Sequence, residues 1–74
     1  MPHVTIKHFP KHLDEPQRER LVARLTEAVQ DAFDVDAAVI SIALQEVAPE
    51  AWDSEVYQPE IAARPDLLAK PPRY

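Results

Sequence analysis

The chain contains no glycine and no asparagine, but eight prolines. Phosphate-binding loops of the Rossmann and Walker types are built on glycine, so nucleotide sites of those kinds are excluded. Tight two-residue hairpin turns need positive φ angles, which glycine, asparagine and aspartate supply best, and here only aspartate remains. We therefore expect the strands of this protein to be joined by helical crossovers rather than by hairpins.

A chain of 74 residues is expected to form one domain, spanning residues 1–74. A domain of this size buries only about 60% of its unfolded surface, so its own core is marginal. Disulfides and thiolate metal sites are excluded because there is no cysteine. The three histidines do not make a structural zinc site without cysteines. We expect no metal, and we expect further copies of the chain to provide the missing stability.

The charge balance also limits the partners. Thirteen acidic residues against eight basic ones give a formal net charge of −5, which argues against a nucleic acid or an anionic membrane as partner. No apolar run is long enough to span a membrane. The first residues show no basic segment followed by an apolar stretch, as a secretion signal would. The sequence thus predicts a cytoplasmic protein.

Two segments, residues 2–9 and 39–47, show the period-two alternation of strands with one buried face. In both, β-branched and other apolar side chains alternate with polar or small ones. The side chains expected to face inward are Val4, Ile6, Ile40, Ile42 and Leu44.

A helix is predicted between the two strands. Asp14 is a good capping residue, Gln17 follows three positions later, and Pro16 falls in the first turn, where its missing N–H does no harm. Apolar residues then recur at three- and four-residue spacing. The helix is expected to end near Phe33, because Asp34 begins a segment that breaks the pattern and places anions at the helix carboxyl end.

A strand, a crossing helix and a second strand make a βαβ unit with parallel strands, and an α+β fold class. One such unit buries little apolar surface. Pairing of two protomers into a four-stranded sheet, with the helices on one face, would bury more. A homo-oligomer of βαβ protomers is therefore expected.

The remaining third of the chain is less regular. Residues 49–52 resemble the first turn of a helix, but Pro59 and Pro65 are expected to limit any helix to short pieces. Residues 70–74 read as an extended, basic end.

Pro2 is the residue with the clearest potential for chemistry. Its small side chain permits removal of Met1 by methionine aminopeptidase, which leaves a secondary amine at the start of the chain. An α-amino group titrates closer to neutrality than other backbone groups, so a free proline nitrogen can act as a general base. The alternative is that this proline merely follows the initiator and has no catalytic role.

The order and spacing of these features resemble the 4-oxalocrotonate tautomerase family, and nearly the whole chain takes part in the resemblance. Within that family the segments look like its phenylpyruvate tautomerase (PptA-like) branch. The segments that carry the resemblance are residues 2–7 (PHVTIK), 13–15 (LDE), 40–45 (ISIALQ), 49–52 (PEAW), 56–61 (VYQPEI) and 70–74 (KPPRY).

The resemblance implies a βαβ protomer that assembles as dimers or hexamers, with an amino-terminal proline as general base. Pro2 would take a proton from one atom of an enol or keto acid and return it to another. No metal or organic cofactor is implied. The substrates implied are small 2-hydroxydienoates or enol forms of aryl pyruvates. The proline-rich tail favours a homodimer over a hexamer.

The sequence departs from the founding enzyme of the family at two arginines that hold a dicarboxylate. Their positions correspond to His12, beside Lys11, and Ser41, so a bidentate clamp is missing at both. A monocarboxylate such as an aryl enolpyruvate is therefore the expected substrate, with His12 and Ser41 as candidate binding residues. The alternative for His12 is a solvated loop histidine without a role in binding. The alternative for Ser41 is a small strand residue without such a role.

Trp52 matches the aromatic wall of the family and is the third candidate binding residue. It would exclude water and stack on an aryl substrate; the alternative is ordinary packing in a dimer interface. Lys70 and Arg73 are cations that could close over the site, an idea that depends on their charge alone. His3 and His8 fall on the first strand and are expected to be structural or partly exposed.

Two other functions remain open. A dehalogenase or decarboxylase of the same superfamily would also use the proline, but such chemistry uses arginines to polarise the substrate, and the pair is absent. A non-catalytic βαβ interaction module would keep the fold and tolerate a retained Met1, because a blocked proline nitrogen cannot act as a base.

Overall fold

The computed structural model describes all 74 residues, and its main elements follow the predicted order. Strand β1 (His3–His8) leads into helix α1 (Glu15–Phe33), which returns the chain to strand β2 (Ser41–Glu46). The two strands form a parallel two-stranded sheet. The predicted βαβ unit and its helical crossover are confirmed.

The register of the sheet keeps apolar and polar side chains apart. Val4 lies opposite Ile42, and Ile6 opposite Leu44, which places these apolar pairs on one face. The alternation read from the sequence is confirmed. The second strand is shorter than predicted, because Ala37–Val39 (η1) form a single 3₁₀ turn and the strand begins only at Ser41.

Helix α1 begins and ends where the sequence places it. The Asp14 carboxylate accepts the backbone N–H of Gln17 at 2.8 Å, and the Gln17 side chain accepts the N–H of Asp14 at 3.0 Å, which completes a capping box. At the other end Asp34 adopts a left-handed conformation with φ of 52°, and its N–H donates to the Gln30 carbonyl. Aspartate thus holds a position that glycine commonly takes.

The tail differs from the prediction. After a turn at Pro49–Ala51 (η2), a ten-residue π-helix runs over Asp53–Ala62 (η3), and a further turn follows at Pro65–Leu67 (η4). The expectation that Pro59 limits helices to short pieces is wrong, because Pro59 lies inside η3. Proline removes only one N–H donor, and the wide turns continue past it, as in the bond from the N–H of Ala63 to the carbonyl of Gln58.

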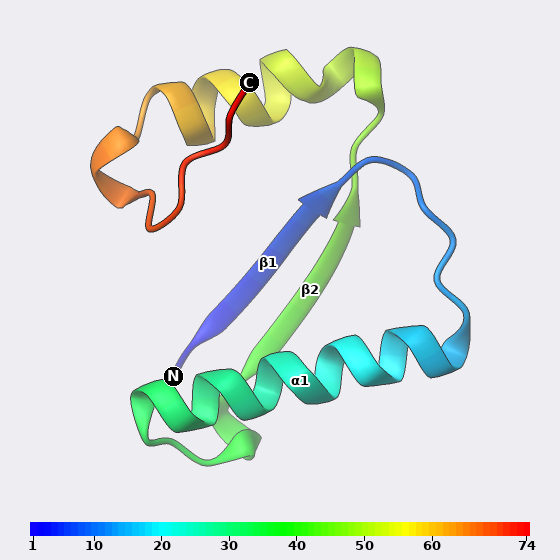
Figure 1. Ribbon diagram of the computed structural model, residues 1–74, viewed down its shortest axis with the longest axis vertical. Coiled ribbons are helices and arrows are strands. Elements are labelled where there is room, and N and C mark those ends of the chain that lie inside the picture. The colour runs from blue at the N-terminus through cyan, green and yellow to red at the C-terminus, as the bar shows by residue number, and fades with distance from the viewer.

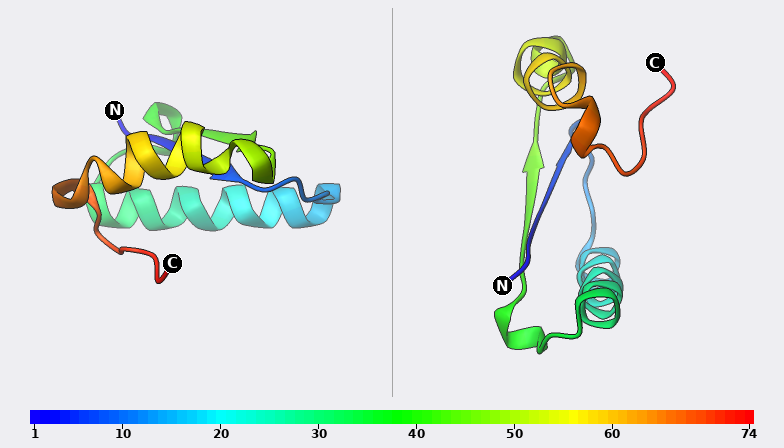
Figure 2. Two further views of the ribbon diagram at one scale, coloured as in Figure 1. Left: turned by 90° about the horizontal axis from the view of Figure 1, so that it is seen from above. Right: turned by 90° about the vertical axis from the view of Figure 1, so that its left-hand side faces the viewer.

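The elements are arranged openly in space. The two strands run between α1 and η3, so the helices lie at opposite sides of the molecule (Figures 1 and 2). The radius of gyration is 14.0 Å, whereas about 11 Å is typical of a compact domain of this length. Only Val47 and Val56 are buried, and α1 has no buried residue. A single chain therefore leaves most of its apolar surface in contact with solvent.

None of the helices combines the length and the apolar character needed to cross a membrane.

Candidate active site

Pro2 lies directly before β1, half-buried at the amino end of the sheet. Its carbonyl accepts the backbone N–H of Ser41 at 3.2 Å, so two of the predicted site residues are neighbours. Met1 is 99% exposed, which leaves the bond between Met1 and Pro2 open to a peptidase. With Met1 attached the Pro2 nitrogen is an amide, and with Met1 removed it is an amine.

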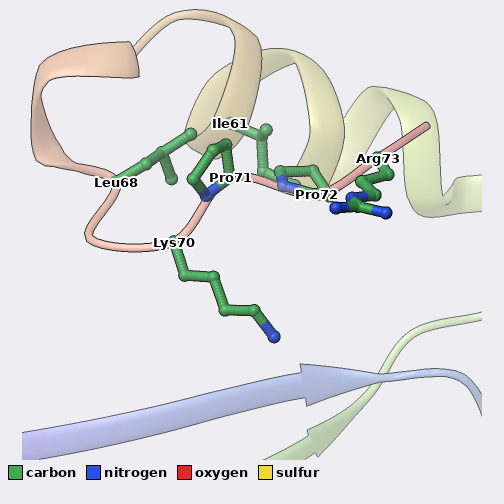
Figure 3. Close-up of a pocket in the computed structure, with 6 residues that line it drawn as sticks. All are labelled: Ile61, Leu68, Lys70, Pro71, Pro72 and Arg73. Atoms are coloured by element: carbon green, nitrogen blue, oxygen red, sulfur yellow. The ribbon is translucent and has the colours of Figure 1, made fainter.

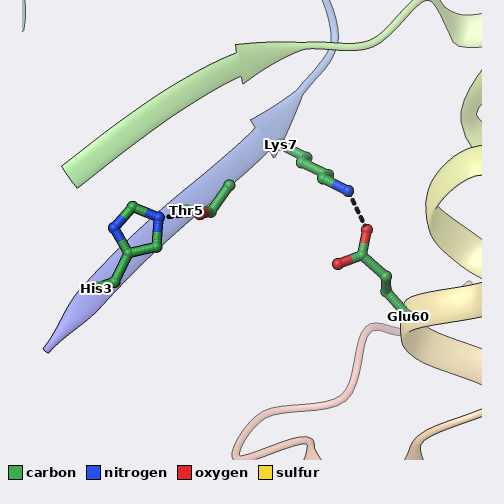
Figure 4. Close-up of polar contacts among 4 residues, drawn as sticks. All are labelled: His3, Thr5, Lys7 and Glu60. Atoms are coloured by element: carbon green, nitrogen blue, oxygen red, sulfur yellow. Dashed lines mark hydrogen bonds and ion pairs between the residues drawn. The ribbon is translucent and has the colours of Figure 1, made fainter. Parts of the chain in front are cut away.

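Two hydroxyl groups hold the imidazole of His3 on the polar face of the sheet. Its Nδ1 lies 2.6 Å from the Ser41 Oγ, and its Nε2 lies 3.1 Å from the Thr5 Oγ1 (Figure 4 shows the contact with Thr5). A neutral imidazole donates from one nitrogen and accepts at the other, and hydroxyls can serve in either role. The Ser41 hydroxyl is therefore oriented by a histidine beside Pro2.

The same face of β1 is tied to the tail. The Lys7 ammonium forms an ion pair with the Glu60 carboxylate on η3 (Figure 4). Both side chains remain partly exposed, so this pair contributes modestly to stability. The pair connects η3 with the polar face of β1.

Trp52 lies beyond the carboxyl ends of the strands, where it joins a small aromatic cluster. Its ring packs edge-to-face on Phe9, with centroids 5.1 Å apart. Its indole N–H donates to the Tyr74 hydroxyl at 3.1 Å, and the Tyr74 ring lies 5.7 Å from that of Tyr57. Three of these aromatic side chains, those of Phe9, Trp52 and Tyr74, border a largely apolar hollow of about 610 Å³. The hollow is lined by Lys7, His8, Phe9, Trp52 and Tyr74.

His12 is exposed on the loop between β1 and α1. It borders a smaller hollow of about 300 Å³ that also contains Lys11, Arg18 and Glu46. His12 makes no hydrogen bond within the chain.

The four predicted site residues fall into two groups within one chain. Pro2 and Ser41 lie at the amino ends of the strands, whereas His12 and Trp52 lie past their carboxyl ends. At about 3.3 Å per residue, β1 alone separates the groups by roughly 20 Å. One protomer therefore does not bring the four together.

Comparison with known proteins shows to which family the chain belongs. A family model described as tautomerase enzyme matches residues 2–56 of this chain. The chain belongs to the tautomerase family. It is accordingly a tautomerase, an isomerase that acts on small molecules.

Several curated proteins are similar to this tautomerase over its whole length. It is 40% identical to Tautomerase PptA of Cronobacter sakazakii and 38% identical to Tautomerase PptA of Pectobacterium atrosepticum. It is also 40% identical to Tautomerase PptA of Escherichia coli O139:H28. Each comparison covers 100% of this chain and 97% of the relative. These relatives agree with the resemblance read from the sequence motifs.

The structure adds contacts that the sequence did not reveal. His3 and Thr5 had no assigned part beside Ser41, although strand alternation places all three on polar faces. Only the strand register, which pairs His3 with Ser41, joins them. Phe9 and Tyr74 were likewise not linked to Trp52, because nothing in the sequence says where the tail of this tautomerase folds back.

Proposed function

We propose that this tautomerase converts the enol form of aryl pyruvates to the keto form, with the Pro2 nitrogen as general base once Met1 is removed. The observation that carries the proposal is the position of Pro2, at the start of β1 and hydrogen-bonded through its carbonyl to Ser41. The exposure of Met1 supports its removal.

The proposed reaction is a proton transfer within one substrate. The Pro2 nitrogen accepts the proton of the enol hydroxyl on C2, and the resulting prolinium delivers a proton to C3. The C2–C3 double bond becomes single as the C2–O bond becomes a carbonyl. Atoms and charge balance, and the amine returns to its starting state.

The substrate class follows from the charges and the aromatic side chains. Without an arginine at position 12 or 41, the site lacks the paired forks that grip a second carboxylate. Trp52, Phe9 and Tyr74 offer aromatic surface for an aryl group. A monocarboxylate with an aromatic ring therefore suits the site better than an aliphatic dicarboxylate.

A homodimer is proposed as the working form, with two chains completing a four-stranded sheet. Two-fold pairing about an axis perpendicular to the strands places the amino end of one sheet beside the carboxyl end of its partner. Trp52 of one protomer would then approach Pro2 of the other. The open shape and the two buried side chains of the single chain support this pairing. The proline-rich tail favours a dimer over a hexamer.

The test is the rate of phenylenolpyruvate ketonisation, followed by ultraviolet absorbance, on protein whose intact mass shows that it begins at Pro2. The matched control is the same protein with Met1 retained. We expect a rate well above the buffer background only with the free amine. Equal rates for both forms would remove the Pro2 nitrogen from the mechanism.

The other functions become outcomes of this test. A free Pro2 with no rate above background would favour a dehalogenase or decarboxylase, or a non-catalytic module. The cytoplasmic location also remains a prediction, which cell fractionation with an antibody to this chain would check.

A further inference from the structure

We propose that Lys70 and Arg73 bind the substrate carboxylate in a hollow formed by the tail, in place of the absent arginine clamp. This inference rests on the proposed function for the identity of the substrate, while the hollow itself is a feature of the fold. The ligand class it would take is an aryl monocarboxylate.

The hollow combines an apolar wall with two cations. Its volume is about 620 Å³, and no acidic side chain lines it. Such a lining suits a ligand with an apolar body and one negative end. The residues that line it are Ile61, Leu68, Lys70, Pro71, Pro72 and Arg73 (Figure 3).

Both cations lack a carboxylate partner within the chain. The chain carries thirteen acidic residues, yet its one ion pair joins Lys7 to Glu60. In Figure 3 the Lys70 side chain leaves the tail and points toward the strands. Lys70 and Arg73 both line this hollow, so the tail offers an anion one ammonium, a point charge, and one guanidinium, a planar fork.

Two side-chain contacts connect the tail and η3 with the rest of the chain. Tyr74 follows Arg73 directly, and its hydroxyl accepts the indole N–H of Trp52. Ile61 follows Glu60, whose ion pair with Lys7 connects η3 with the polar face of β1. In the proposed dimer Tyr74, which is hydrogen-bonded to Trp52, would approach Pro2 of the partner chain together with Trp52. The hollow is thereby linked to the aromatic wall and to the sheet.

The test measures binding separately from catalysis. The probe is 3-phenylpropanoate, which has the aryl group and carboxylate but no enol to convert, and its amide is the uncharged control. Isothermal titration would compare the wild type with the double variant Lys70→Gln, Arg73→Gln. The matched control, Arg20→Gln with Arg24→Gln, removes two exposed cations of α1, away from every candidate binding residue.

We expect the double variant to bind 3-phenylpropanoate about tenfold more weakly or worse, because it loses charge-assisted hydrogen bonds. The matched control should bind as the wild type does, and the amide should bind weakly to all three. For phenylenolpyruvate the double variant should raise KM with little change in kcat. Circular dichroism would confirm that each variant is folded.

Three results would overturn the inference: no binding of 3-phenylpropanoate to the wild type, equal binding to the double variant, or equal weakening by the matched control. The Pro2→Ala variant separates this inference from the proposed function. It should retain 3-phenylpropanoate binding while losing turnover. If turnover survives in that variant but the tail cations still govern binding, the proline mechanism fails and the carboxylate site stands.

Discussion

At the scale of single residues, the proposed chemistry depends on the Pro2 nitrogen, which is an amide while Met1 is attached and an amine once Met1 is removed. The Pro2 nitrogen accepts a proton only as an amine. The backbone N–H of Ser41 donates to the Pro2 carbonyl, which holds Pro2 at the amino end of the sheet. His3 orients the Ser41 hydroxyl from the same face. The proposed base and its neighbours therefore form a local unit that folds within one chain.

Replacing Pro2 by alanine should lower kcat for phenylenolpyruvate roughly tenfold or more, since a positioned general base contributes at least that much. The alanine amine is not held by a ring, so its direction is lost. Steady-state kinetics on protein lacking Met1 would measure the loss, and far-ultraviolet circular dichroism should show an unchanged fold. An unaltered kcat would mean that another group moves the proton.

Asp34 offers a second test at this scale. Its φ of 52° favours glycine, and its charge lies at the carboxyl end of α1. Asp34→Gly should therefore raise the free energy of unfolding by about 0.5–1 kcal/mol, measured by urea denaturation at fixed chain concentration. Asp34→Ala keeps the Cβ and should be less stable than Asp34→Gly. Equal stability of the two variants would show that the left-handed conformation has no energetic weight.

At the scale of elements, short-range patterns predicted most of the structure. The capping residues, the apolar spacing and the strand alternation each act within a few residues, so α1 and both strands could be read from the sequence. Val39 was wrongly assigned to the second strand because alternation continues through a turn. The prediction that Pro59 limits helix length was wrong. The free-energy cost of a proline depends on the helix type around it, and Pro59 lies inside the π-helix η3.

The capping box gives the prediction for α1. Asp14→Ala removes the carboxylate that accepts the N–H of Gln17, and should lower the free energy of unfolding by about 1 kcal/mol. Asp31→Ala, which removes an exposed acid near the other end of the helix, serves as the control and should not destabilise. If urea titrations show that both variants lose the same free energy of unfolding, the loss results from the removed charge and not from the capping box.

At the scale of the whole molecule, the sequence named candidate site residues but did not predict how one chain arranges them. Pro2 was a candidate because of its chemistry, and Ser41, His12 and Trp52 because of the family resemblance. One chain holds the four in two groups at opposite ends of β1. Contacts of the tail, such as that of Tyr74 with Trp52, connect residues far apart in sequence, and no local pattern records them.

A mixing experiment tests whether two chains share one site. Pro2→Ala and Trp52→Ala proteins would be unfolded together and refolded at equal amounts. If each site uses Pro2 of one chain and Trp52 of the other, half of the dimers contain one intact site, which gives about a quarter of the wild-type activity. A mixture that shows only the average of the two separate variants would place the site within single chains.

Because Met1 is exposed, its removal can determine when the enzyme becomes active. Under the proposed mechanism, the newly synthesised protein would be a zymogen whose propeptide is one residue long. Folding and activation are then separate events, since no part of the sheet depends on Met1. The active fraction of the enzyme in a cell would be set by the processing of its first peptide bond, and not only by the amount of protein made.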